Sequence, residues 1–166
     1  MALNFNTAVI TAGNPGSIIK KSRSAYFASY SGICTADTKF GLCASFVDNK
    51  IVLGTQIATA LAVEVGIVAY DEEYLAINPI YTQNLDPKTV DYKSSLYYPK
   101  NASGYIVRGS GLQMYALSDG SNAIAVGDKL ESNGTGYLIK NNANRAVAIA
   151  LDVSNAANTV IRIQLI

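Results

Sequence analysis

Alternation of side-chain type is the strongest pattern in the last third of the chain. In residues 144–153 the larger side chains alternate with alanine or aspartate: Val147, Ile149, Leu151 and Val153 against Ala146, Ala148, Ala150 and Asp152. The last eight residues have the same period: Thr159, Ile161, Ile163 and Leu165 against Val160, Arg162, Gln164 and Ile166. Because a strand points successive side chains to opposite faces, both segments are predicted to be half-buried β-strands.

Two dipeptides predict tight hairpin turns. Asn133-Gly134 and Asp48-Asn49 both accept the positive φ that a type I′ turn requires at its two central positions. The alternating segments that they separate are Lys129–Ser132 from Thr135–Lys140 and Lys39–Val47 from Lys50–Leu53. Each pair of segments is therefore predicted to form an antiparallel hairpin with a two-residue turn.

The remaining apolar segments are short and are bounded by glycine, asparagine or aspartate. Those predicted as strands are Asn4–Ile10, Ser17–Lys20, Ala25–Ser31, Gln56–Tyr70, Tyr105–Arg108, Leu112–Leu117 and Ile124–Val126. Residues 56–70 also carry apolar side chains at helical spacing, but their β-branched content and Gly66 favour a strand. Many short strands with such turns predict an all-β fold, an antiparallel β-barrel or sandwich.

Residues 71–103 have no such period and are predicted to form a long irregular inserted arm. They contain three prolines, five of the twelve acidic residues and a cluster of tyrosines. A long irregular segment is uncommon in a compact domain and is usually functional where it occurs. The sequence therefore predicts three parts: an N-terminal β region (1–70), the arm (71–103) and a C-terminal barrel-like region (104–166) packed with the first.

Charge is sparse, and its placement bears on possible partners. Charged residues make up 15% of the chain, against about 25% in an average soluble protein. Either a macromolecule covers part of the surface, or the surface is rich in neutral polar residues. A basic cluster, Lys20, Lys21 and Arg23, could contact an acidic neighbour or form a solvated loop. No basic stripe with interleaved aromatic residues is present, so nucleic-acid binding is not expected.

The residue types of most enzymes are missing. The chain has no histidine, the commonest general base and metal ligand. Cys34 and Cys43 lie nine residues apart in apolar stretches, a spacing without metal-site character, and are expected to be buried free thiols. No catalytic activity, cofactor or metal is therefore expected. Glycines and polar residues interrupt the apolar window 51–69, so no membrane span is expected.

Tyrosine is the aromatic residue that stands out, with eleven copies and no tryptophan. Six of these lie between residues 74 and 105, too many for a small core to bury. Tyrosine offers a large contact area and tolerates a wet edge, as protein interfaces require. A carbohydrate site, as in a fibre or adhesin module, would use the same side chains. The predicted contact residues are Tyr81, Tyr92, Tyr97, Tyr98, Lys20, Lys21 and Arg23.

Four motifs between residues 104 and 166 resemble the C-terminal half of tailed-phage capsid decoration, or structural cement, proteins. They are a Val-Gly-Asp start of a strand (126–128), a short hairpin, an alanine-rich strand (146–151) and a final strand that carries Arg162. The resemblance implies a β-rich protein, often a trimer, that clamps neighbouring major capsid subunits on the capsid exterior. Residues Met1–Asn4 lack an export-signal pattern, so assembly in the host cytoplasm is expected.

Overall fold

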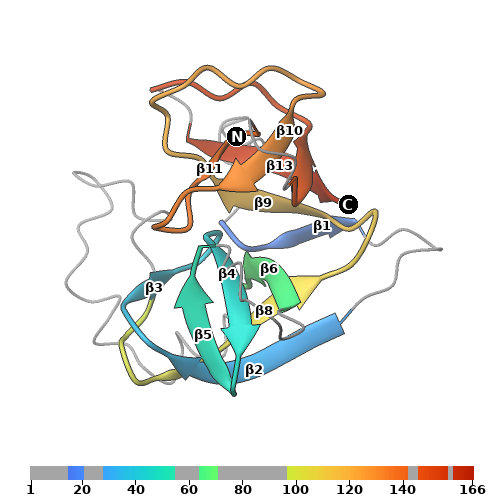
Figure 1. Cartoon of the computed structure of the whole chain (residues 1–166). Coiled ribbons are helices and arrows are strands. Elements are labelled where there is room, and N and C mark those ends of the chain that lie inside the picture. Colours follow the sequence, from blue (N-terminus) through green and yellow to red (C-terminus); the bar gives the residue numbers. More distant parts are fainter. Residues whose placement is uncertain (1–14, 21–27, 55–63, 71–96, 142–145, 157–158) are drawn as a thin grey trace, which may run out of the picture.

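The computed structural model describes residues 15–20, 28–54, 64–70, 97–141, 146–156 and 159–166. In these ranges the chain forms thirteen β-strands and no helix. The strands make one closed barrel, one six-stranded sheet and a two-stranded ribbon (Figure 1). The predicted all-β fold class, with a barrel, is therefore confirmed.

Five strands close the barrel in the lower half of Figure 1. In spatial order they are β2 (Ala28–Cys34), β5 (Lys50–Leu53), β4 (Cys43–Val47), β6 (Glu64–Val68) and β8 (Ser103–Arg108). All neighbours are antiparallel except β2 and β5, which are parallel. Closure gives every barrel strand two neighbours, which removes the unpaired edges of an open sheet.

The six-stranded sheet lies above the barrel in Figure 1 and is antiparallel throughout. Its order is β1 (Ile18–Lys20), β9 (Gln113–Leu117), β13 (Val160–Leu165), β12 (Ala148–Ala150), β10 (Lys129–Ser132) and β11 (Leu138–Lys140). Leu138 of the edge strand β11 also forms a bridge with Ser118, which follows β9. The β11 edge of the sheet therefore curves back toward β9. The ribbon pairs β3 (Thr38–Lys39) with β7 (Tyr97–Tyr98).

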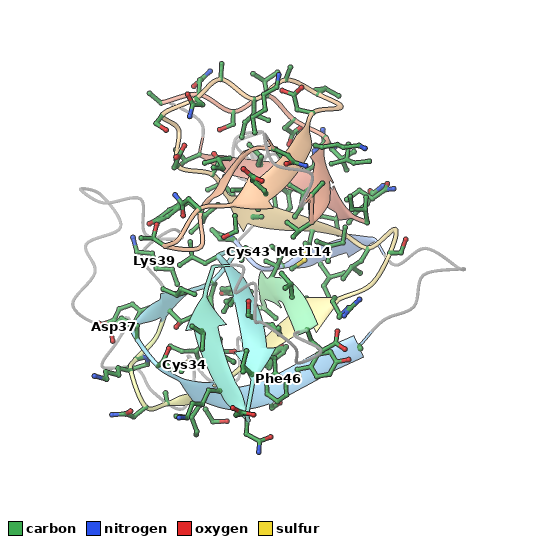
Figure 2. All side chains as sticks on the ribbon, in the orientation of Figure 1. Cys34, Asp37, Lys39, Cys43, Phe46 and Met114 are labelled. Carbon is green, nitrogen blue, oxygen red and sulfur yellow. The ribbon has the colours of Figure 1, made fainter. Side chains whose placement is uncertain are left out.

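The barrel and the sheet share their hydrophobic cores. One apolar cluster joins Cys43 and Ile67 of the barrel to Met114 and Ile163 of the sheet. Figure 2 places Cys43 and Met114 close together at the junction. A second cluster joins barrel residues such as Ala44 and Ile106 to Leu117 of β9. The two β units are therefore packed together by continuous apolar contact.

The sheet boundaries differ from the three-part division of the sequence. The predicted start of the C-terminal region, residue 104, falls inside β8, which belongs to the barrel. The N-terminal strand β1 pairs with β9 of the upper sheet instead of joining the barrel. Of the predicted arm, residues 71–96 lie outside the described residues. Strand membership follows hydrogen-bond pairing across the chain, which a linear division cannot represent.

Of the two predicted type I′ turns, the one at Asp48-Asn49 is confirmed. Both residues have positive φ, 49° and 59°, and Val47 pairs with Lys50 across the turn. The β4–β5 hairpin therefore has the predicted two-residue connection.

The turn predicted at Asn133-Gly134 is wrong, although the β10–β11 hairpin exists. Neither residue has positive φ; the left-handed position is Gly136, with a φ of 94°. Asn133 and Tyr137 face each other across a three-residue loop, and the Asn133 side-chain oxygen accepts hydrogen bonds from the backbone N–H groups of Thr135 and Tyr137, both at 3.0 Å. These side-chain bonds favour the longer loop over the two-residue turn.

Several predicted strands are shorter in the structure. In the described part of the segment predicted at 144–153, residues 146–153, the strand is β12, in which Ala148 and Ala150 are buried while Ile149 is half-buried, so the small side chains face the core. Residues 124–126 form no strand, and Ile124 makes a single bridge. A turn divides 39–47 into β3 and β4. The strand predicted at 4–10 lies outside the described residues.

Candidate functional site

The structure places few of the predicted contact residues on the surface. Tyr97 is half-buried in β7, and Lys20 is the last residue of β1. Tyr81, Tyr92, Lys21 and Arg23 lie outside the described residues. The proposed contact surface is therefore represented in the structure mainly by Tyr97.

Tyr98 is a core residue, and its prediction as a surface contact is wrong. Its side chain is 0% exposed and packs edge-to-face on Phe40, with ring centroids 4.9 Å apart. Its hydroxyl donates a hydrogen bond to the carbonyl of Ala69 at 3.4 Å. A Cβ on Gly104 would lie 2.7 Å from the Tyr98 ring, so the missing side chain of Gly104 makes room for the tyrosine.

The β3–β7 ribbon explains why two adjacent tyrosines have different surroundings. Thr38 pairs with Tyr98, and Lys39 pairs with Tyr97. Since successive strand residues point to opposite faces, burial of Tyr98 turns Tyr97 to the other face. Tyr97 therefore lies directly opposite Lys39 in the ribbon.

Both cysteines are buried and free, as predicted. Burial raises the pKa of the Cys43 thiol to about 12 and also raises the pKa of Cys34. Both side chains are therefore protonated at neutral pH and are poor nucleophiles.

The Val-Gly-Asp motif forms a tight turn that leads into β10. The Asp128 N–H donates to the Ala125 carbonyl at 3.1 Å, and Gly127 has a φ of 89°. The Asp128 carboxylate accepts the Ala125 N–H at 2.9 Å and forms an ion pair with Lys140 at 3.1 Å. The Ala125 hydrogen bond, followed by Lys140, lowers the pKa of Asp128. One carboxylate therefore ties the turn to the end of β11.

Arg162, in the last strand, forms a forked ion pair with Asp152. Its Nη2 lies 2.6 Å from Asp152 Oδ1, and its Nε donates to Oδ2 at 2.9 Å. The Arg162 backbone N–H also donates to Oδ2, at 3.0 Å. The hydrogen bond from the guanidinium is the main cause that lowers the pKa of Asp152. These contacts join Asp152, which follows β12, to Arg162 of β13.

The Asp152–Arg162 pair predicts a contribution to stability that is lost in acid. Because the pKa of Asp152 is lowered in the fold, the stabilisation is present above the unfolded-state pKa of about 4 and disappears as pH falls through the lower folded pKa. Both side chains are partly exposed, so Asp152→Asn should cost about 0.5–1 kcal/mol at neutral pH. Urea unfolding at neutral and acidic pH measures this. A difference between wild type and variant that does not shrink in acid would contradict the assignment.

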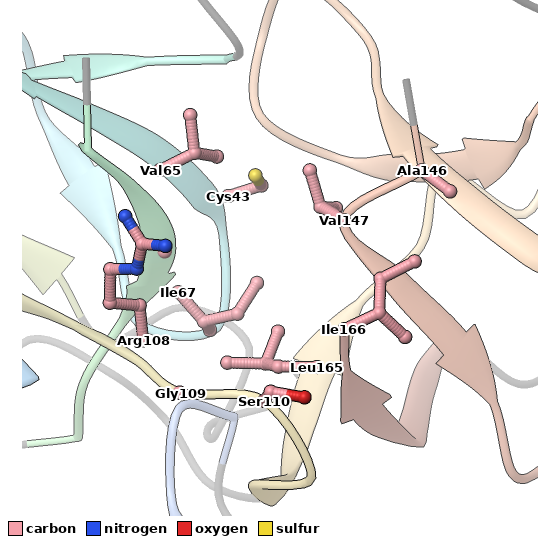
Figure 3. Close-up of a pocket in the computed structure, with 11 residues that line it drawn as sticks. Cys43, Val65, Ile67, Arg108, Gly109, Ser110, Ala146, Val147, Leu165 and Ile166 are labelled. Carbon is pink, nitrogen blue, oxygen red and sulfur yellow. The ribbon is translucent and has the colours of Figure 1, made fainter. Parts of the chain in front are cut away.

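A pocket of about 440 Å³ opens at the seam between the barrel and the sheet. Figure 3 shows Val65, Ile67 and Arg108 of the barrel on one side, and Val147 and Ile166 on the other. Its lining comes from segments scattered between residues 43 and 166, so no contiguous sequence motif predicts the pocket.

A smaller pocket, about 250 Å³, lies between the β3 ribbon and the upper sheet. Lys39, Asp119 and Tyr137 contribute to its lining, and Lys39 Nζ donates to the Tyr137 hydroxyl at 3.4 Å. It combines one cation, one carboxylate and one aromatic ring.

The described residues contain neither a cluster of metal-ligating side chains nor a membrane-spanning helix. No three acidic, cysteine or histidine side chains in the described ranges gather closely enough to hold a metal ion. Within the same part of the chain, no helix has the length and apolar character needed to cross a membrane.

The similarity of this chain to known proteins lies among solved structures. No protein-family profile matches the chain, and no curated protein sequence matches it significantly. Among solved structures, it is similar to the N base of head fiber gp8.5 in bacteriophage phi29, with a TM-score of 0.44 and 13% identity, over 85% of this chain and 95% of that one. A TM-score of this size does not establish a shared topology, so we base no functional conclusion on it.

Proposed function

We propose that this chain is a non-enzymatic structural protein of a phage virion. It binds the outer surface of the capsid and cements neighbouring major capsid subunits, and it acts as a homo-oligomer, most simply a trimer. No cofactor takes part in this function.

The observation that supports the proposal is the arrangement of the motifs that resemble capsid decoration proteins. The Gly127-Asp128 turn leads into β10, the hairpin continues into β11, and the alanine-rich β12 lies between β10 and the arginine-bearing β13. Segments that the resemblance groups together are thus neighbours in one sheet, held by the Asp128–Lys140 and Asp152–Arg162 pairs. A sheet fixed in this way is suited to a static, load-bearing role.

Composition is consistent with a surface that is partly covered. Only 15% of the residues are charged, and tyrosines cluster between residues 74 and 105. Specific stable interfaces bury about 1,200–2,000 Å² in total, and a few aromatic anchors supply most of the affinity. With Tyr98 assigned to the core, the proposed contacts are Tyr81, Tyr92, Tyr97, Lys20, Lys21 and Arg23.

Replacing the three remaining tyrosines should release the protein from capsids. The triple variant Tyr81→Ala, Tyr92→Ala, Tyr97→Ala is expected to lower affinity by more than about tenfold, because it removes the aromatic anchors. Co-sedimentation with capsids of the virus that encodes the chain, stripped of this protein, measures occupancy. Urea unfolding of the free variant shows that the loss is not due to unfolding.

Tyr98→Phe is the matched control, because it alters a tyrosine that the fold buries. It should leave occupancy unchanged. Full occupancy by the triple variant would reject this contact surface. The carbohydrate-binding alternative predicts a different result: the wild-type protein does not co-sediment with capsids but binds glycans on an array, and the triple variant does not bind them. That result would replace the proposal.

A further inference from the structure

The Asn133-Gly134 pair, which forms no two-residue turn here, has the residue types that allow an asparagine to react with its own backbone. The side-chain amide carbon of an asparagine can close a five-membered ring with the backbone nitrogen of the next residue, and glycine leaves that nitrogen open because it has no Cβ. Asn133 is the one asparagine of the chain that is followed by glycine. In the β10–β11 loop, Asn133 is half-buried and Gly134 is exposed to solvent.

Hydrogen bonds fold the Asn133 side chain over the peptide unit with which it would react. Its Oδ1 accepts the backbone N–H groups of Thr135 and Tyr137, both at 3.0 Å, and the Thr135 hydroxyl donates to the same oxygen at 2.9 Å. Because the Thr135 nitrogen directly follows Gly134 in the chain, its bond to Oδ1 holds the Asn133 Cγ beside the Gly134 peptide. Three donors on one carbonyl oxygen also stabilise the negative charge that develops there when a nucleophile adds to Cγ.

The attacking and leaving nitrogens make no hydrogen bond, whereas the backbone around them is held. Within the described residues, neither the Gly134 N–H nor the Asn133 Nδ2 has a hydrogen-bond partner. The Asn133 N–H donates to the Tyr137 carbonyl at 2.9 Å, and the Asn133 carbonyl accepts the Gly136 N–H at 3.1 Å. The reaction can therefore begin without breaking a hydrogen bond of the loop.

We propose that Asn133 is a deamidation site of the folded protein. Hydroxide removes the Gly134 amide proton, and the nitrogen forms a bond to Cγ of Asn133. The Cγ–Nδ2 bond then breaks, and Nδ2 takes a proton from water and leaves as ammonia, which regenerates hydroxide. Water opens the cyclic imide at Cγ to give aspartate, or at the backbone carbonyl carbon to give isoaspartate. In total one water is consumed and one ammonia is released, without oxidation or reduction.

The isoaspartate product changes the contact between the sheet and the barrel. Its main chain passes through Cβ and Cγ, which adds one carbon atom between residues 133 and 134. Two contacts depend on the present path of the loop, which lies on the barrel side of the sheet in Figure 1. The Gly136 carbonyl accepts the Cys43 N–H at 2.7 Å, and a Cβ on Gly54 would lie 2.9 Å from the Asn133 carbonyl oxygen. Deamidation is therefore an irreversible chemical change at the junction of the two β units.

The direct test is incubation of the full chain at neutral and mildly alkaline pH, followed by proteolysis, chromatography that separates aspartate from isoaspartate peptides, and mass spectrometry. The peptide that contains Asn133 should exchange NH for O. Its rate should rise with hydroxide concentration and be at least as high in the native protein as in the chain unfolded in guanidinium chloride. Asn101 is the internal comparison and should stay unmodified, because the N–H that follows it, from Ala102, donates to the Pro99 carbonyl at 3.0 Å.

Two variants test the nucleophile and the carbonyl donors separately. Gly134→Ala places a methyl group beside the attacking nitrogen and should slow the reaction at least about tenfold. A Cβ there would meet no atom within 4 Å, so the loop should keep its conformation. Thr135→Val removes the hydroxyl donor to Oδ1 and should slow the reaction on the order of tenfold in the native protein, but not in the unfolded chain. Thr135→Ser keeps the hydroxyl and is the matched control, with the wild-type rate expected.

Three results would overturn the proposal. A native protein that reacts more slowly than the unfolded chain would show that the loop protects Asn133. Equal native rates for wild type and Thr135→Val would show that the donors on Oδ1 do not promote ring closure. Modification of Asn101 ahead of Asn133 would place the reactive position elsewhere on the chain.

Discussion

Replacing Tyr98 with alanine should lower the free energy of unfolding by about 3–5 kcal/mol, as for other large aromatic residues removed from a core. The ring is fully buried, packs edge-to-face on Phe40 and fills the space above Gly104. The cavity left by alanine has backbone on one side and cannot collapse easily. Tyr98→Phe should cost about 1 kcal/mol, because it keeps the ring in the core and removes the hydroxyl, whose hydrogen bond to Ala69 is long at 3.4 Å. Urea unfolding measures both values.

Tyr97→Ala provides the comparison within the same strand. Tyr97 is half-buried, so its replacement should cost much less than that of Tyr98. Equal losses at the two positions would mean that β7 does not present opposite faces to the core and the surface, and the assignment of Tyr98 to the core would fail.

Substitution of Gly136 should be the second severe change. Gly136 has a φ of 94°, and a Cβ there would lie 2.8 Å from the carbonyl oxygen of Cys43. Its own carbonyl accepts the Cys43 N–H at 2.7 Å, so the loop cannot move away without breaking a contact to the barrel. We expect Gly136→Ala to lower the free energy of unfolding by at least about 3 kcal/mol, by combining backbone strain with a steric clash. Thermal or urea unfolding provides the measurement.

Gly127→Ala is the matched control for Gly136→Ala. Gly127 has nearly the same φ, 89°, but a Cβ at this position would meet no atom within 4 Å. Only the cost of a left-handed alanine remains, about 1–2 kcal/mol. If the two variants were equally stable, the close contact between the β10–β11 loop and β4 would be absent from the folded protein.

The sequence predicts local structure well where one interaction decides it. Asp48-Asn49 adopts the positive φ values that its residue types favour, and the hydrogen bond from the Ile33 N–H to the Asn49 carbonyl is compatible with the two-residue turn. Asn133-Gly134 has the same chemistry, yet the Asn133 side chain bonds to the backbone of Thr135 and Tyr137, and the packing of Gly136 against Cys43 fixes a longer loop. The second outcome depends on a tertiary contact that no turn rule includes.

Which face of a strand lies inward is also a tertiary property. In residues 144–153 the alternation correctly predicts a strand, but the core accepts Ala148 and Ala150 because Leu165 and Leu130 lie across from Ala148 on the neighbouring strands. In the last strand the large residues Ile161, Ile163 and Leu165 do face inward, as size alone suggests.

The candidate sites were less accessible to sequence reasoning than the strands. A tyrosine count cannot separate Tyr97 from Tyr98, because burial of Tyr98 depends on packing against Phe40, which is distant in sequence, and on the space left by Gly104. The seam pocket combines residues from both β units, and its apolar members are indistinguishable from ordinary core residues until the fold brings them together.

The most direct test of the proposed function is a cryo-electron microscopy reconstruction of the virions that carry this chain, compared with virions from which its gene has been deleted. We predict difference density on the outer capsid surface, into which the barrel and sheet fit and which contacts at least two neighbouring major capsid subunits. Absence of the chain from purified virions, or its density on the tail or inside the capsid, would contradict the proposal.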